Sequence, residues 1–366
     1  MDINNLHLSV EGNVCIATIG SKAYKVNALF YKVLSGIKSG LSVEDSVNMV
    51  SAETETDNDM LLDKFNTFVK VVQQAKSKSY IRCKRIVIRE KRVNEIAHSM
   101  VLLYSRDVFT ILLIAGIMTN IAYLGLNYSH LRPSNYTIEI GIMVFLGYLL
   151  SLIIHEIGHA TATASVGKDA KEIGFGFYLM FPVFYTDVTS IWCMEKKERI
   201  LVSVGGVYFQ LMVNTIIIGL LLIIPQSALI NALRGLVISN IFVVIMSMTP
   251  FFRNDGYWIL SDFWSIPNLL RKSDDVLFHP CSQYDKGSNH EKYRLLLFGI
   301  ANNMFRFYIF VRLVLNLYKN LTLITDQMAY NRMLGVAVSI TISLVGMYWI
   351  IMCYYKTFRY ENQDRY

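Results

Sequence analysis

Charged residues are scarce in this chain. Asp, Glu, Lys and Arg together make up 17% of its 366 residues, whereas 53% are hydrophobic. A soluble globular protein usually carries about 25% charged residues. A disordered chain contains fewer apolar residues than a globular protein does. Prolines are also few, 6 in all. The composition therefore argues against an entirely soluble or disordered chain and predicts a membrane protein.

Cysteines are few and have no paired spacing. This argues against a disulfide framework and against a zinc site built on cysteine, so we expect the thiols to be reduced. The chain has five cysteines, an odd number, and none forms a Cys-x-x-Cys pair: Cys15, Cys83, Cys193, Cys281 and Cys353.

A cleavable signal pattern is missing at the start, where the first hundred residues are typical of a soluble domain. We therefore expect the first transmembrane helix itself to direct insertion. The formal net charge of +7 could indicate binding to nucleic acid. The Lys and Arg residues cluster beside apolar runs, however, where they orient membrane helices. We expect no nucleic-acid partner and a surrounding of membrane lipid.

Long apolar runs are the dominant feature of the rest of the chain. The first, VFTILLIAGIMTNIAYLGL, carries no charge and is close to the ~20 residues that a helix needs to cross a bilayer. Six runs of this kind predict a mainly α, polytopic membrane protein. They cover residues 108–126, 138–166, 200–224, 228–249, 295–318 and 333–355.

Basic residues flank these runs unevenly. The segment KSKSYIRCKRIVIREKR precedes the first run, and further basic residues follow the second. Because basic loops stay on the cytoplasmic side, the N-terminus is expected in the cytoplasm, and with six spans the C-terminus as well. The basic residues after the second run are Lys168, Lys171, Lys196, Lys197 and Arg199.

Two segments do not fit a simple span. Residues 172–190, EIGFGFYLMFPVFYTDVTS, alternate small and aromatic residues, which predicts a re-entrant β-hairpin. Such a backbone is tolerated at membrane depth only where protein or a watery cavity covers it. Residues 254–269, NDGYWILSDFWSIPNL, are aromatic and broken by glycine and proline, so we expect them at the membrane interface.

The first 75 residues predict a small α+β, winged-helix-like domain in the cytoplasm. Three short strands are expected, in LHLSV, VCIATIG and KAYKV, and then a helix in NALFYKVLSGIKSG. A second helix is opened by Ser42 with Asp45 three residues later, a capping-box pattern. A third has one apolar face: Met60, Leu61, Phe65, Phe68, Val69 and Val72. The domain order is thus 1–75, a basic linker with a strand and an amphipathic helix at 76–107, and a membrane domain at 108–360.

The motif HEIGH lies within the second apolar run. His155 and His159 are four residues apart, so on a helix they share one face and can both ligate one metal ion. Glu156 can then reach a water bound to that ion. A chance match is improbable, on the order of one in a hundred from composition. The alternative is a pair of histidines that neighbouring helices satisfy, but ionisable groups inside a membrane generally mark function. Zinc most commonly takes this ligand set.

A catalytic zinc site needs a third protein ligand. His155 is expected about 17 residues into a span that enters from outside, roughly 26 Å deep at 1.5 Å per residue. Asp255 follows the fourth span at its cytoplasmic end, and Gly256 allows a sharp turn there. Asp255 is therefore favoured and Glu172 is the runner-up. Position 165, where the metzincin histidine would fall, is Ser165, and the full set of candidates is Glu172, Asp187, Asp255 and Asp262.

HEIGH and the later NDGYW together resemble the site-2 protease family of intramembrane zinc metalloproteases. The stretches YTDVTSIW, ERILVSVGG and DGYWILSDFWSIPNL resemble its peptide zinc metalloprotease branch. The resemblance implies His155, His159 and Asp255 as ligands of one zinc ion per chain, with Glu156 as catalytic base. The chain departs from the family's glycine-proline-x-x-asparagine motif, where Gln210 is either an oxyanion or substrate residue or an interhelical hydrogen bond.

Residues 1–75 resemble, more loosely, winged-helix domains that hold a leader peptide for enzymes of peptide maturation. Such domains add the peptide as a strand; the alternative is a structural cap without a ligand. The expected function is an intramembrane endopeptidase of the bacterial cytoplasmic membrane that matures a small ribosomally made peptide. Two alternatives stay open: regulated proteolysis of a membrane-anchored signalling protein, and a non-enzymatic, zinc-dependent export or immunity protein. The roles of Asp187, Gln210 and Asp262 do not follow from the sequence.

Overall fold

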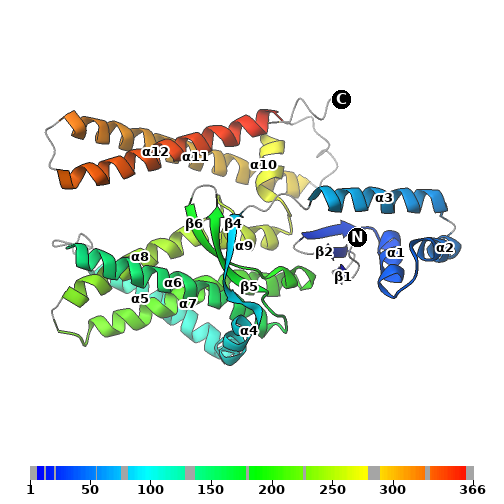
Figure 1. Cartoon of the computed structure of the whole chain (residues 1–366), viewed down its shortest axis with the longest axis horizontal. Coiled ribbons are helices and arrows are strands. Elements are labelled where there is room, and N and C mark those ends of the chain that lie inside the picture. Colours follow the sequence, from blue (N-terminus) through cyan, green and yellow to red (C-terminus); the bar gives the residue numbers. More distant parts are fainter. Residues whose placement is uncertain are drawn as a thin grey trace. The chain divides into compact units, whose positions relative to one another are not determined.

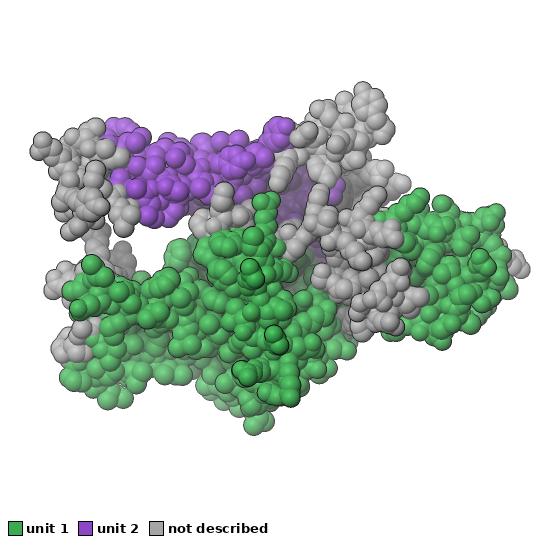
Figure 2. Space-filling model, viewed as in Figure 1, with its two compact units in different colours: residues 1–250, 254–263 green, residues 251–253, 264–366 purple. Residues whose placement is uncertain are grey.

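The protein is described from a computed structural model in which the chain forms two compact units. Unit 1 comprises residues 1–250 and 254–263, and unit 2 comprises residues 251–253 and 264–366 (Figure 2). The structure describes residues 6–11, 14–19, 22–54, 56–75, 81–127, 137–178, 181–225, 228–278, 289–325 and 330–359.

The N-terminal part of unit 1 forms the strands and helices that the sequence predicts. An antiparallel sheet of order β1-β2-β3 precedes three helices (Figure 1). The side chain of Asn27 accepts the N–H of Phe30 at the start of the first helix, and Ser42 accepts the N–H of Asp45 at the second, as expected for capping residues. The elements are β1 (Leu6–Glu11), β2 (Val14–Ile19), β3 (Lys22–Val26), α1 (Ala28–Lys38), α2 (Val43–Thr54) and α3 (Asn58–Ala75).

Two small apolar clusters hold this part together. One joins the sheet to α1 through Leu6, Ala17 and Leu34, and the other joins α1, α2 and α3. Leu61 is buried in the second cluster, as expected, but Met60 is 48% exposed. Consecutive residues on a helix point about 100° apart, so the two cannot both lie at the centre of one face.

A second antiparallel sheet, of order β4-β5-β6, belongs to the membrane part of unit 1. The predicted hairpin at 172–190 is confirmed as β5 (Glu172–Tyr178) and β6 (Phe181–Thr186). The strand and helix expected in the linker are also present, as β4 (Ile81–Arg89) and α4 (Glu90–Ser99), followed by the short helix η2 (Val101–Tyr104). Pairing of β4 with the hairpin was not predicted.

Among the residues that the structure describes, six helices are long and apolar enough to cross a membrane, in agreement with the six predicted spans. The fold is that of a mainly α, polytopic membrane protein. In unit 1, α7 packs against α5, α6 and α8 (Figure 1). The candidate membrane spans among the described residues of unit 1 are α5 (Arg106–Asn127), α6 (Ile138–Ser165), α7 (Lys196–Leu221) and α8 (Ala228–Met248), and α9 (Asp255–Trp264) follows them.

Unit 2 is built on a helical hairpin of α11 (Asn289–Thr325) and α12 (Tyr330–Arg359), with α10 (Leu269–Phe278) packed on α11. Arg306 of α11 is buried and forms a two-pronged ion pair with Asp274 of α10, at 3.2 and 3.3 Å. A buried arginine needs such a partner, because an unpaired charge is costly in an apolar surrounding.

Candidate metal centre

The long helix α6 carries the motif HEIGH in its second half. Thr137 accepts the N–H of Ile140 and so starts the helix. His155 and His159 lie one turn apart on it, and their Nε2 atoms are 3.3 Å from each other. Both imidazoles are buried. Two ring nitrogens that face each other inside a protein form a natural half of a cation site.

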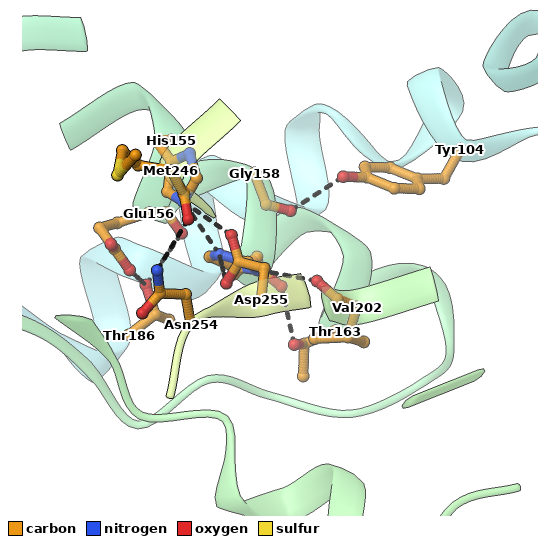
Figure 3. A network of polar contacts seen from close by, with 11 residues as sticks. Tyr104, His155, Glu156, Gly158, Thr163, Thr186, Val202, Met246, Asn254 and Asp255 are labelled. Atoms are coloured by element: carbon orange, nitrogen blue, oxygen red, sulfur yellow. Dashed lines mark hydrogen bonds and ion pairs between the residues drawn. The ribbon is translucent and has the colours of Figure 1, made fainter. Parts of the chain in front are cut away.

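Asp255, the first residue of α9, completes the group (Figure 3). One carboxylate oxygen lies 3.3 Å from Nε2 of His155 and the other 3.4 Å from Nε2 of His159. The turn into α9 is tight: Asn254 donates to the carbonyl of Met246 at 2.8 Å. The sequence predicted a sharp turn at Gly256, but this residue lies within the first turn of α9. Glycine is needed there because a β-carbon would collide with the main chain of Met248.

The spacing of these atoms fits a zinc ion. Zinc–ligand bonds of about 2.0–2.1 Å give a tetrahedron whose edges measure about 3.3–3.4 Å. The two imidazole nitrogens are one such edge apart, at 3.3 Å, and each lies at a similar distance, 3.3 or 3.4 Å, from a different carboxylate oxygen of Asp255. Oδ2 of Asp255 is buried and has no hydrogen-bond partner among the described residues, as expected of an atom reserved for a cation. Among the described residues, His155, His159 and Asp255 thus form a group that could hold a metal ion.

The charge state of Asp255 suits this role. Burial by itself raises the pKa of its carboxyl, but the imidazoles of His159 and His155 outweigh burial and hold that pKa below its usual value. The carboxylate is therefore ionised and acts purely as an acceptor.

Helix α7 fixes the orientation of one imidazole. Nδ1 of His159 lies 2.8 Å from the carbonyl oxygen of Val202, which can only accept, so the ring nitrogen donates. When the ring is neutral, this hydrogen bond keeps its proton on Nδ1 and leaves the lone pair of Nε2 for a metal ion. In the described residues, Nδ1 of His155 has no such partner.

Glycines let α7 approach the two histidines closely. A β-carbon at Gly206 would collide with Nε2 of both His155 and His159. Between the two histidines on α6, Gly158 meets Gly205 of α7 and lets the two backbones approach each other, and the hydroxyl of Tyr104 donates to the carbonyl of Gly158 at 2.9 Å. The absence of a side chain at position 206 therefore leaves the space in which a metal ion would lie.

Glu156 is next to the ligand group and is bound by a residue that the sequence analysis missed. The hydroxyl of Thr186, the last residue of β6, lies 2.7 Å from Oε2 of Glu156 and 3.0 Å from its main-chain oxygen (Figure 3). The predicted hairpin was the available signal, because it placed residue 186 at a strand end. Nothing in a single sequence says which hydroxyl of that hairpin meets α6.

Gln210 lies in a buried chain of polar side chains that joins four helices. Its amide group donates to Ser151 at 2.8 Å and to Asn240 at 2.9 Å. Asn240 donates in turn to Asn214, and Asn214 to Asn120, at 3.0 and 2.8 Å. Of the two roles that the sequence left open for Gln210, this geometry matches the interhelical hydrogen bond. An oxyanion role would require one N–H to be released, and that role stays a prediction.

The other three candidate carboxylates have different partners and do not join the histidines. Glu172 accepts from the hydroxyl of Tyr185 at 2.8 Å, and Asp187 accepts the N–H of Thr189 at 3.1 Å. Asp262 accepts from Nε of Arg199 at 2.9 Å. Burial raises the pKa of the Asp262 carboxyl, while Arg199 opposes this rise. Of the four candidates, the structure thus brings Asp255 to the histidines.

One similar protein gives an independent indication. Over 156 residues, or 40% of this chain, the sequence is 27% identical to the Bacillus subtilis (strain 168) protein named "Putative peptide zinc metalloprotease protein YydH". The match spans 60% of the length of that protein. No protein-family model matches the chain, and no solved structure matches it.

Proposed function

We propose that this protein is a zinc-dependent endopeptidase of the site-2 protease type, which hydrolyses a peptide bond in or beside the membrane. One observation carries the proposal: His155 and His159 of α6 and Asp255 of α9 each bring a donor atom to within 4.8 Å of the others, and Glu156 directly follows His155 in the chain. The name of the Bacillus subtilis protein supports the same reading.

In this proposal His155, His159 and Asp255 hold one zinc ion and Glu156 moves protons. A zinc ion held there would polarise the carbonyl to be cleaved and lower the pKa of a water molecule from 15.7 towards roughly 7. Glu156 takes one proton as the water oxygen bonds to the carbonyl carbon. It returns that proton to the amine nitrogen as the carbon–nitrogen bond breaks.

The second sheet suggests how a substrate is held. A helix hides its carbonyl groups, so a peptide must be extended before it can be cut, and an outer strand can pair with it. Of the two outer strands, β4 has two register shifts and a positive φ at Cys83, irregularities that oppose further pairing. β6 pairs with β5 without a shift and ends at Thr186, which contacts Glu156. Substrate is therefore proposed to pair with β6.

The proposed substrate is a small ribosomally made peptide whose leader is held by residues 1–75. The protein would lie in the bacterial cytoplasmic membrane with both termini in the cytoplasm, as the basic flanks predict. Deleting residues 1–75 should abolish the choice of substrate under this reading. A protease that cuts a membrane-anchored signalling protein would instead keep its activity without them.

The direct test compares the masses of peptides in cells that produce the wild-type chain or Glu156→Gln. The shortened products should disappear in Glu156→Gln, while zinc stays bound because no ligand is lost. Glu139→Gln is the matched control, since Glu139 lies exposed in the first turn of the same helix. Identical peptide masses in all three strains, or transport or immunity retained in Glu156→Gln, would favour the non-enzymatic alternative.

A further inference from the structure

The hydroxyl of Thr186 has two acceptors and one proton. It lies 2.7 Å from Oε2 of Glu156 and 3.0 Å from the main-chain oxygen of the same residue. A threonine hydroxyl can donate only once. The two possible hydrogen bonds have different consequences. A bond to Oε2 would orient the carboxylate of Glu156, whereas a bond to the main-chain oxygen would only attach the hairpin to α6.

The main-chain oxygen has less need of the proton. Glu156 lies well inside α6, where each carbonyl already accepts the N–H of the residue four positions later. The carboxylate, by contrast, has no other hydrogen-bond partner among the described residues and lies at the shorter distance. A charged acceptor also forms the stronger hydrogen bond. Distance and charge both assign the proton to Oε2.

Thr186 is itself firmly placed. It pairs with Ile173 at the base of the β5–β6 hairpin, and the next residue continues the ladder through Asp187 N–H to Glu172, at 2.9 Å. Tyr185 on the other side is mostly buried and donates to the side chain of Glu172 at 2.8 Å. A hydroxyl fixed by a strand in this way can hold a neighbouring carboxylate in one orientation.

We propose that Thr186 is a positioning residue for Glu156. Its hydroxyl holds Oε2 and leaves Oε1 as the oxygen that takes the proton of the attacking water. The end of the strand on which substrate is held is thereby tied to the base that acts on it. This inference rests on the proposed function for the identity of the base, whereas the hydrogen bond itself can be tested without activity.

The first test is a double-mutant cycle on purified, full-length, metal-free protein in detergent with a chelator. Thr186→Val should lower the apparent melting temperature by about 2–5 °C in the wild type and by less than half as much in Glu156→Ala. Truncation to alanine removes the carboxylate but keeps the main-chain oxygen. Equal shifts in both backgrounds would show that Thr186 binds only the main chain and would overturn the proposal. Thr161→Val is the control, because Thr161 donates to the main chain of Ile157 and should give equal shifts.

The second test measures peptide products in cells that carry the same variants. Thr186→Val should lower the product yield about tenfold, the lower end of the effect expected for residues that orient a catalytic group, with zinc content unchanged. Thr186→Ser keeps the hydroxyl and should restore most of the yield. Products that vanish in Glu156→Gln but stay at the wild-type level in Thr186→Val would overturn the role of Thr186 alone. Products that persist in Glu156→Gln would instead overturn the proposed function.

Discussion

The helix pairs α6–α7 and α11–α12 both consist of candidate membrane spans, but their glycines meet different atoms. Between α6 and α7, a β-carbon at Gly205 would lie 2.7 Å from the carbonyl oxygen of Gly158, which is backbone. Between α11 and α12, a β-carbon at Gly346 would lie 2.7 Å from Cδ1 of Leu313, the end of a flexible side chain. The first contact cannot yield without moving a helix, whereas the second can.

This difference matches where the candidate chemistry lies. Small residues let helix backbones approach closely in membranes, and close approach makes a rigid pair. His155 and His159 lie on the rigid pair, with Val202 of α7 holding one imidazole. A metal donor set must be held to within about 0.5 Å, so a pair that cannot adjust is the suitable support. The pair α11–α12 has no such demand among its described residues.

Removing a ligand should have the largest effect. Asp255→Ala leaves two histidines, so zinc affinity should fall by more than about 100-fold, beyond the 10–100-fold typical of residues that only orient ligands. Metal analysis of the purified protein should drop from about one zinc per chain to nearly none. Glu172→Ala should keep its zinc, because Glu172 contacts Tyr185 rather than the histidines. The opposite pattern would show that the ligand assignment is wrong.

The rigid pair should tolerate an added methyl group poorly. Gly206→Ala places a β-carbon against Nε2 of both histidines, so zinc affinity should fall by about 10–100-fold. Gly346→Ala is the matched change on the pair α11–α12 and should leave zinc affinity unaltered. Titration with a competing chelator measures both. Equal affinities in the two variants would remove the distinction between the helix pairs.

Unit 2 should affect stability rather than the metal. Arg306→Met leaves Asp274 buried without its partner, which costs about 3–5 kcal/mol for a buried ion pair. The apparent melting temperature should fall while zinc content stays at the wild-type value. Replacing both residues, Arg306→Met with Asp274→Leu, should recover part of the loss. Loss of zinc in Arg306→Met would mean that α11 supports the metal centre after all.

The smallest effect is expected from the far end of α9. Arg199 and Asp262 join the start of α7 to α9, and Lys196 of α7 also donates to the carbonyl of Phe263 at 2.5 Å. Arg199→Gln should loosen the helix that carries Asp255 and lower zinc affinity only a few-fold, since the turn at Asn254 still holds its start. Arg271→Gln breaks an exposed pair within α10 and serves as the control.

Local sequence patterns were sufficient for much of the fold and for the grouping of His155, His159 and Asp255. The 3.6-residue repeat of a helix places His155 beside His159, and apolar length predicts the six long apolar helices that are found in the described part of the chain. Asp255 was favoured because chain direction and span length put it at the same depth as His155. These inferences need only spacing within one element or the count of crossings.

The missed features depend on contacts between elements that a single sequence does not report. Thr186 meets Glu156 across 30 residues, and β4 pairs with β5 far along the chain. Gln210 was recognised as a polar position in α7, but its partner Ser151 lies 59 residues away. Each of these contacts follows from how helices and strands pack, which periodicity does not determine.

The chain of buried amides also bears on how the protein is made. Asn120 lies in the first span, and its side-chain partner Asn214 follows 94 residues later. At about 5–20 residues per second, a ribosome needs about 5–20 s to deliver that partner. Until α7 and then α8 enter the bilayer, the side-chain oxygen of Asn120 in α5 lies in lipid or at the translocon without its partner Asn214. The four-helix core is therefore completed late, and the aspartate of the metal centre, which follows α8, arrives last.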